Sequence, residues 1–459
     1  MGNGRFTGRA LRRRAVGALA LIALAGFGAA EAHAAKGDLR FVQCVDDVGP
    51  GGDDCARSAP GLGTPLGLAI SPDGRSVYVA AYVDGAVAHL RRNKRTGKLR
   101  SAGCVESPPL AACAAEAQGL GGVTAVAVHP NGRHVYAVSG GDGALMHLKR
   151  NKRTGKLTYA RCIADTVEGV ACPARVPGLS GANDLAISRD GRSLYVAAVG
   201  SHAITHFRLN KRTGAPRFAA CIEDDDAPTD QCSARRQGLW EARAVEVSRN
   251  GKFVYVVSGG NHDPVIPLRD AAVAYFKRNK KSGALKGRGC IADNDHLGDD
   301  DCGGRRADGI YDAWSLGLSP DGRFLYAGTF STGAFGVFAV RNGVPSFRYC
   351  VEAPLRPPPC AVTAQAIGRS VAFAFDSRGR SMYVATARGI QPFIRQPRSG
   401  ILAERPCIDD DDAAPYDASC QRRANGLLGA TALAVSPDDR FLYAASSNED
   451  AVSVFRRKR

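Results

Sequence analysis

A seven-fold internal repeat constrains the fold of this chain more than any other feature. The phrase Ser-Pro-Asp-Gly-Arg-Ser-Val-Tyr-Val-Ala-Ala at residues 71–81 recurs six more times, at steps of 57 to 71 residues. Each copy has a tyrosine in the same register, which accounts for seven of the 13 tyrosines. They are Tyr78, Tyr136, Tyr195, Tyr255, Tyr326, Tyr383 and Tyr443. Such a period predicts a repeat architecture.

Each repeat contains four short β signals separated by turn signals. In the second repeat we expect strands at 125–128, 134–138, 144–149 and 157–163. Four antiparallel strands at this period are typical of a propeller blade. Helical periodicity is absent after residue 35. The sequence therefore predicts an all-β fold: a seven-bladed β-propeller with four antiparallel strands per blade.

The two ends of the chain indicate how the ring closes. Residues 37–44 resemble the fourth strand of a blade without its first three strands. The last repeat, which ends at residue 459, supplies three strands and lacks the fourth. We therefore expect the N-terminal strand to complete the C-terminal blade, so that neither blade leaves an unpaired edge.

The 14 cysteines follow the same period. Each pair starts at the end of an expected fourth strand and encloses the loop to the next blade. The pairs are Cys44/Cys55, Cys104/Cys113, Cys162/Cys172, Cys221/Cys232, Cys290/Cys302, Cys350/Cys360 and Cys407/Cys420. The repetition favours seven local disulfides, and two cysteines per loop do not supply the four ligands of a structural zinc site.

Residues 1–35 have the features of an export signal. Four arginines, at positions 9 and 12–14, precede an apolar run at 15–30, and Ala-His-Ala near residue 34 offers a cleavage site. The run is too short to span a bilayer as a stable helix. We expect a signal peptide at 1–35, with the general secretory route favoured over the twin-arginine route, and one propeller domain at 36–459. The expected location is extracellular, periplasmic or in the cell envelope, where cysteines oxidise.

The tyrosine-containing phrase also indicates a family. Residues 71–80, with Leu-Tyr-Val-Ala at 194–197 and Met-Tyr-Val-Ala at 382–385, resemble the YVTN repeat of lactonase-type seven-bladed propellers. That family includes enzymes similar to 6-phosphogluconolactonase and the muconate-cycloisomerising propellers. The resemblance covers nearly all of the chain after residue 35 and is specific for blades rather than for chemistry. It implies His, Arg and Glu side chains around the channel in members that act on lactones, but no such motif maps residue by residue onto this sequence.

Polar residues that break the repeat in single blades are the best candidates for a site. Two residues before the turn serine, six blades have alanine or glycine and the fourth has Glu246. Nearer the start of this innermost strand, blades three to six have further exceptions. These are Asn183, Asp184, Glu241, Arg243, Asp312, Trp314 and Arg369. Because consecutive blades supply them, we expect these side chains to gather at one mouth of the central channel.

Two roles fit these residues. The charged set, Asp184, Glu241, Arg243, Glu246, Asp312 and Arg369, could act as general acid, base and electrostatic stabiliser at a lactone carbonyl. Asn183 and Trp314, with His262 from a long insertion at 259–270, would bind an anionic or sugar-like ligand. The alternative is an ion-pair network that plugs the channel. His89, His147 and His206 share a tolerant strand position and are expected to be structural.

Charge is distributed unevenly along each repeat. Of the 44 acidic residues, 23 lie between paired cysteines. Clustered carboxylates such as Asp293, Asp295 and Asp299 suit calcium, although a solvated acidic face is the simpler interpretation. Basic residues gather at the hairpins between third and fourth strands, for example 91–95, 149–153 and 277–281. That face could bind anionic envelope polymers or proteins, whereas nucleic acid is not expected in an exported chain without interleaved aromatic residues. A monomer without a transmembrane segment is expected.

Two functions remain open on this basis. The first is a secreted binding or scaffold propeller of the cell envelope or exterior, which the sequence favours because no known catalytic constellation is complete. The second is a lactonase-like hydrolase acting at the central channel. The two differ in whether the blade-breaking residues face an open funnel.

Overall fold

A computed structural model describes residues 37–48, 55–108, 112–167, 169–228, 231–260, 271–294, 302–353, 360, 362–364, 367–369, 372–411, 420 and 422–458. These residues belong to one compact unit, Lys36–Arg459. Their regular structure is entirely β, and no helix among them is long and apolar enough to cross a membrane.

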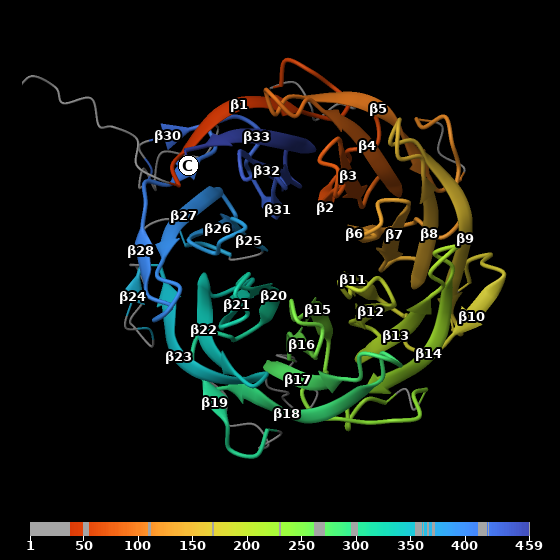
Figure 1. Ribbon diagram of the computed structural model, residues 1–459, viewed down its shortest axis with the longest axis vertical. Helices are drawn as coiled ribbons and strands as arrows, with labels where there is room; N and C mark the ends of the chain where they lie inside the picture. The colour runs from red at the N-terminus through yellow and green to blue at the C-terminus, as the bar shows by residue number, and fades with distance from the viewer. Residues whose placement is uncertain are drawn as a thin grey trace, which may run out of the picture. The chain divides into compact units, whose positions relative to one another are not determined.

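The strands form seven separate sheets, which are the blades of a propeller (Figure 1). Blade 1 has β2 (Pro65–Ile70), β3 (Ser76–Ala81), β4 (Ala86–Arg92) and β5 (Leu99–Glu106). Blade 2 has β6 (Val123–Val128), β7 (His134–Ser139), β8 (Ala144–Arg150), β9 (Leu157–Asp165) and β10 (Ala174–Val176). Blade 3 has β11 (Ala182–Ile187), β12 (Ser193–Ala198), β13 (Ala203–Leu209) and β14 (Pro216–Glu223). Blade 4 has β15 (Ala242–Val247), β16 (Phe253–Ser258), β17 (Ala272–Arg278), β18 (Leu285–Asp293) and β19 (Arg306–Ala307).

The remaining blades follow the same plan. Blade 5 has β20 (Ala313–Leu318), β21 (Phe324–Thr329), β22 (Ala334–Arg341), β23 (Val344–Glu352) and β24 (Val362–Thr363). Blade 6 has β25 (Ala372–Phe375), β26 (Ser381–Thr386), β27 (Gly389–Arg395), β28 (Leu402–Glu404), β29 (Ile408–Asp409) and β30 (Arg422–Arg423). Blade 7 has β31 (Ala430–Val435), β32 (Phe441–Ser446) and β33 (Ala451–Arg457), and β1 (Leu39–Val45) completes it. The first strand of each blade contacts that of the next, and β31 contacts β2, which closes the ring.

The predicted closure is confirmed. Strand β1 pairs antiparallel with β33, from Leu39 opposite Arg457 to Val45 opposite Val452. The two ends of the described chain therefore share one sheet (Figure 1). Strand β1 covers the outer side of β33, as a fourth strand does in the other blades.

All seven predicted disulfides are present, with S–S bonds across 9 to 13 residues of sequence. The bonded pairs are Cys44–Cys55, Cys104–Cys113, Cys162–Cys172, Cys221–Cys232, Cys290–Cys302, Cys350–Cys360 and Cys407–Cys420. None of these cysteines is free. The bonds indicate an oxidising environment, extracellular or periplasmic.

The two cysteines of a pair occupy different places in the blade. In six pairs the first cysteine lies within an outer strand, and in blade 6 Cys407 directly precedes β29. The second cysteine lies outside the strands in every pair. These loop cysteines are Cys55, Cys113, Cys172, Cys232, Cys302, Cys360 and Cys420. Each bond therefore ties the far end of the disulfide-closed loop back to the outer part of its blade.

The prediction of four strands per blade is incomplete. The disulfide-closed loop returns beside the fourth strand in parallel, and this adds the short strands β10, β19, β24 and β30 to blades 2, 4, 5 and 6. The return follows from the bond itself, because joining the loop cysteine to the edge strand brings the residues after it alongside that strand.

The repeated tyrosines connect adjacent blades. Tyr78 is buried in blade 1 and donates its hydroxyl to the Gly155 carbonyl of blade 2 at 2.6 Å. Arg150, at the end of the third strand of blade 2, returns to blade 1. Its Nε donates to the Tyr78 hydroxyl at 2.7 Å, and its Nη2 pairs with Asp73 at 3.1 Å. Its Nη1 donates to the Gly132 carbonyl at 2.9 Å.

We call this arrangement the guanidinium network. It recurs with four further arginines that lie at the same strand position: Arg92, Arg278, Arg395 and Arg457. The tyrosine stands out in the sequence because a contact between neighbouring blades is repeated around the ring. The expected structural role of the repeated histidines is also confirmed, since His89, His147 and His206 are buried and stack on tyrosines of their own blades.

Candidate active site

The innermost strands of all seven blades enclose one cavity of about 600 Å³, which we call the channel cavity. Small residues of β2, β6 and β31 form part of its wall, among them Gly67, Ala125 and Ala432. Six of the residues predicted from sequence also line it: Asn183, Asp184, Arg243, Glu246, Trp314 and Arg369. The structure therefore brings together the polar exceptions of blades 3 to 6 at an open cavity.

Asp184 lies where blades 3 and 4 meet. Its Oδ1 accepts the backbone N–H of Leu185 at 2.8 Å, and its Oδ2 accepts that of Val245 in β15 at 2.9 Å. Enclosure by the surrounding strands outweighs these hydrogen bonds and raises the pKa of Asp184 to about 6. The side chain is thus held in a fixed position with a pKa close to neutral.

Glu246 replaces the small residue that other blades have at this point of the innermost strand. No cation pairs with it among the described residues. Enclosure, helped by the negative charge of Asp184, raises its pKa to about 8. Two carboxyl groups with separated pKa values and access to one cavity are the arrangement that general acid–base catalysis requires.

Arg243 projects from β15 between a carboxylate and an aromatic ring. Its Nη2 pairs with Glu241 at 2.6 Å, and its guanidinium lies 4.3 Å from the centre of the Trp314 ring. Its Nε is buried without a hydrogen-bond partner among the described residues. Gly259 makes room for this side chain, since a Cβ there would lie 2.2 Å from Nε. The side-chain amide of Asn183 in β11 donates to the Arg243 carbonyl in β15 at 2.7 Å, which joins the two strands.

An aromatic pair forms another wall. Trp314 of β20 lies 4.9 Å from Phe330, ring centre to ring centre. Arg369 is exposed, and its guanidinium lies 4.4 Å from the Phe330 ring centre. Sequence reasoning missed Phe330. No clear signal was available, because the position that follows the second strand varies among the blades and is also aromatic in blade 1, where it is Tyr82.

Glu241 and Asp312 do not line the channel cavity. Both stand at the corner that precedes an innermost strand, with φ of 53° and 51°. Glycine occurs at the same corner in other blades (Gly122, Gly181 and Gly429), as expected for left-handed backbone. Because Thr64 in blade 1 has the same backbone conformation, this conformation is a feature of the repeat. Glu241 contributes indirectly, by orienting Arg243.

Three other predicted site residues, His262, Asp295 and Asp299, lie outside the described residues. Asp293 is buried at the end of β18, rather than exposed on a loop surface. Among the described residues no three His, Cys, Asp or Glu side chains converge as metal ligands would. Calcium binding in this loop stays a prediction.

The cysteines lie away from the candidate site. None of the 14 lines the channel cavity. The loop cysteines Cys172, Cys232, Cys360 and Cys420 are buried, and Cys113 is half-buried, each against its own disulfide partner at the outer part of a blade. A sulfur in a disulfide is neither a nucleophile nor a metal ligand. Their role is therefore structural, as the repeat indicates.

The interpretation of the acidic residues as a solvated face is wrong for the carboxylates that come first in the disulfide-closed loops. Four carboxylates that follow the first cysteine accept a backbone N–H from their own disulfide-closed loop: Asp46, Glu106, Glu223 and Glu352. Four others accept a backbone N–H from the entry to the next blade: Asp47, Asp165, Asp224 and Asp410. Much of the repeated acidity therefore satisfies backbone donors.

Fold and cavity together define a class: a disulfide-bonded seven-bladed β-propeller with a polar cavity in its central channel. The model of the family "Lactonase, 7-bladed beta-propeller" matches residues 68–219 and 121–286, which run from blade 1 into blade 4. This match supports placing the chain with the lactonase-type seven-bladed β-propellers. No curated protein matches the chain in sequence.

Solved structures share the fold at low sequence identity. A candidate 6-phosphogluconolactonase from Bacteroides uniformis gives a TM-score of 0.50 at 19% identity, over 74% of this chain and 83% of that one. The periplasmic gluconolactonase of Pseudomonas aeruginosa gives 0.51 at 20% identity, over 75% and 85%. Hydrazine synthase of Kuenenia stuttgartiensis gives 0.52 at 16% identity, over 86% and 95%. Such likeness establishes the fold and leaves the chemistry to the site.

Proposed function

We propose that the protein hydrolyses the lactones of sugar acids in its channel cavity. The observation that carries this proposal is the convergence of Asp184, Glu246, Arg243 and Arg369 on one open cavity of about 600 Å³. That volume lies within the range of small-molecule sites. The cavity remains open although Arg243 pairs with Glu241, which speaks against a network that plugs the channel.

The carboxyl pair supplies the proton transfers. Near pH 7, Asp184 is ionised and can accept a proton from the water that attacks the lactone carbonyl. Glu246 is protonated and can donate to the ring oxygen as the acyl–oxygen bond breaks. The reaction adds one water to the lactone and gives a hydroxy acid, so its atoms balance without a cofactor.

The arginines and the aromatic pair bind the substrate. The guanidinium groups of Arg369 and Arg243, which both line the channel cavity, are positively charged donors for the oxyanion that forms at the carbonyl carbon, or for a substrate phosphate. Trp314 and Phe330 offer ring faces for a sugar ring. The lactonase names of two structural neighbours fit this role, since they belong to proteins of the same fold.

A kinetic assay tests the proposal directly. Five- and six-membered sugar-acid lactones, neutral and phosphorylated, would be offered to the purified chain, and acid release would be measured above the spontaneous rate. Glu246→Gln should lower kcat/KM by roughly 100-fold or more, the usual contribution of a general acid. Arg369→Ala should mainly raise KM. Lys152→Gln, on an exposed turn, should behave as the unmodified protein. Activity on no lactone, or activity unaffected by Glu246→Gln, would exclude the proposal.

We also infer that residues 1–35 direct export and that the mature chain works outside the cytoplasm. The seven disulfides support this inference, because such bonds persist in oxidising compartments. A secreted binding or scaffold role, which the sequence favoured, has no specific observation in the cavity to support it. N-terminal sequencing of the exported protein would test cleavage near residue 35.

A further inference from the structure

Two interfaces lack the arginine of the guanidinium network. Between blades 2 and 3 Leu209 takes its place, and His129 donates to the Gly191 carbonyl instead. The interface between blades 4 and 5 has no such replacement among the described residues.

Val340 stands in β22 where Arg150 stands in β8 and Arg395 in β27. The hairpin after β22 is also short: Asn342 and Gly343 alone connect it to β23, with φ of 51° and 79°. Other blades have a longer turn at this point, so both the arginine and the turn that meet the neighbouring tyrosine are changed here.

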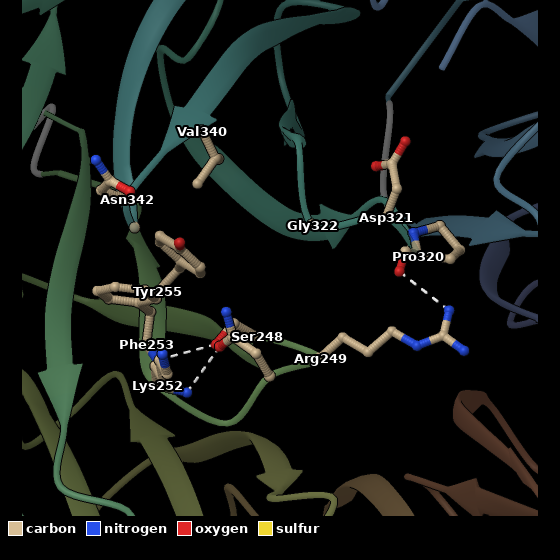
Figure 2. Close-up of a pocket in the computed structure, with 12 residues that line it drawn as sticks. Ser248, Arg249, Lys252, Phe253, Tyr255, Pro320, Asp321, Gly322, Val340 and Asn342 are labelled. Atoms are coloured by element: carbon tan, nitrogen blue, oxygen red, sulfur yellow. Dashed lines mark hydrogen bonds between the residues drawn. The ribbon is translucent and has the colours of Figure 1, made fainter. Parts of the chain in front are cut away.

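A cavity of about 490 Å³ lies at this interface, and we call it the blade 4–5 cavity (Figure 2). Tyr255 and Val340 line it from one side, and Gly322 and Asp321 from the other. Arg249 reaches across and donates to the Pro320 carbonyl at 3.1 Å (Figure 2). None of its lining residues lines the channel cavity, so this site is separate from the proposed active site.

Two polar groups that are bonded at the other interfaces face this cavity without partners. Six of the seven repeated tyrosine hydroxyls form a hydrogen bond to the next blade, and that of Tyr255 forms none among the described residues. The carbonyl in the turn after the innermost strand accepts from an arginine or a histidine in the six other blades. That of Gly322 accepts from no described residue, and a Cβ on Gly322 would meet nothing within 4 Å.

The missing arginine is accompanied by a missing carboxylate. Asn250 stands where Asp73 and Asp190 pair with arginines at other interfaces. Asp321 lines the cavity, but it pairs with Arg395 at 2.9 Å. Arg249 and Lys252 also line the cavity. A guanidinium ligand would therefore enter without an available counter-charge, which makes its desolvation costly.

We propose that the blade 4–5 cavity binds a ligand with a neutral planar amide or urea group. Its N–H groups would donate to the Gly322 carbonyl and the Tyr255 hydroxyl, as a guanidinium does at the five interfaces that have the arginine. Its carbonyl would accept from the Asn250 side-chain amide, whose Oδ1 already accepts from Ser248 and from the backbone of Lys252. Phe253 and Val340 supply an apolar wall for the attached alkyl chain.

The test is a ligand-observed NMR titration of the full disulfide-bonded chain with n-butylurea and n-butylguanidinium. The unmodified protein should bind butylurea saturably at one site and butylguanidinium more weakly. Asn250→Asp restores the carboxylate and should reverse this preference. Val340→Arg should fill the cavity from within and abolish binding of both probes. Ile401→Arg adds the same side chain at an exposed position and should leave binding unchanged.

Tyr255→Phe provides a second readout that does not depend on filling the cavity. Loss of one hydrogen bond should weaken butylurea binding about five-fold. The proposal is overturned if butylurea does not saturate, if butylguanidinium binds the unmodified protein more tightly, or if Val340→Arg and Tyr255→Phe both leave binding intact. Lactone hydrolysis should persist in Val340→Arg, so failure here leaves the proposed function standing.

Discussion

At the scale of single residues, one substitution separates blade 4 from the others. The position of Glu246 is alanine or glycine in the remaining six blades, and none of those small residues lines the channel cavity. A glutamate there extends into the cavity beside Asp184 and becomes difficult to ionise, because water is displaced and a negative charge is close. A single exception to a repeat thus gives the ring a chemically distinct side.

The raised pKa values predict the pH dependence of lactone hydrolysis. Activity needs Asp184 ionised and Glu246 protonated, so kcat/KM should rise as pH passes about 6 and fall as pH passes about 8. The two limits belong to the interacting pair rather than to separate residues. Rates measured from pH 4 to 10 would show a bell-shaped curve with Asp184 and Glu246 both present.

Two variants show which residue sets each pH limit of that curve. Glu246→Gln should remove the fall at high pH, and Asp184→Asn the rise at low pH, each with a lower maximum. An unmodified protein whose rate keeps increasing up to pH 10 above the spontaneous reaction would contradict these roles.

At the scale of strands and loops, most of the repeated sequence serves the junctions between blades. The guanidinium network joins the third strand of one blade to the second strand and turn of its neighbour. Acidic residues near the cysteines bind backbone N–H groups of the disulfide loops in the same repeated way. These buried polar contacts have defined partners, which fixes how far each blade is rotated against the next.

Removal of one arginine from the network should destabilise the ring. Arg150→Ala removes one partner of the Tyr78 hydroxyl and the cation that pairs with the partly exposed Asp73 carboxylate, and about 2–3 kcal/mol of unfolding free energy should be lost. Denaturant unfolding would measure this loss. Arg153→Ala, on the exposed turn nearby, should change stability by less than about 0.5 kcal/mol. Equal effects of the two substitutions would show that the network adds nothing.

Calcium binding is a prediction for the loop between Cys290 and Cys302. If that loop binds the ion, EDTA should lower the midpoint of thermal unfolding, and calcium added in excess should restore it. The double variant Asp295→Asn and Asp299→Asn should be insensitive to both additions. A midpoint that EDTA does not move would remove calcium from the description of this loop.

Features that the repeat encodes could be predicted from the sequence, whereas features that depend on distances between blades could not. The tyrosine register, the cysteine pairs and the shared terminal blade follow from spacing alone. The parallel fifth strands did not, because two-residue pairings such as β19 have no hydrophobic pattern. Polar exceptions such as Arg243 and Trp314 were found by comparing blades, whereas the contribution of Phe330 and the open state of the cavity depended on side-chain packing.

At the scale of the whole molecule, the ring is closed by noncovalent pairing of β1 with β33. The seven disulfides are local and do not connect one blade to a distant one. Stability of the ring therefore depends on contacts between neighbouring blades and on this final strand. A closed ring also keeps blades 3 to 6 at fixed positions around the channel cavity, which holds the proposed catalytic groups in place.

Loss of β1 should open the ring. A chain that lacks residues 37–45 and has Cys55→Ser would expose the edge of β33 and should unfold at much lower denaturant concentration, with a broader transition. Full-length Cys44→Ser with Cys55→Ser loses the same disulfide but keeps the strand, and should lose only about 3 kcal/mol. Fluorescence of the two tryptophans would follow both chains. Identical unfolding of the two chains would contradict closure by β1.

The claim that blades 3 to 6 form a lactone site is tested most directly by a crystal structure with a bound sugar acid, the product of hydrolysis. We predict that its carboxylate contacts Arg369 or Arg243, that a hydroxyl lies within hydrogen-bonding distance of Glu246, and that its ring packs on Trp314 or Phe330. A product bound elsewhere on the protein, with the channel cavity filled only by water at saturating concentration, would contradict the account.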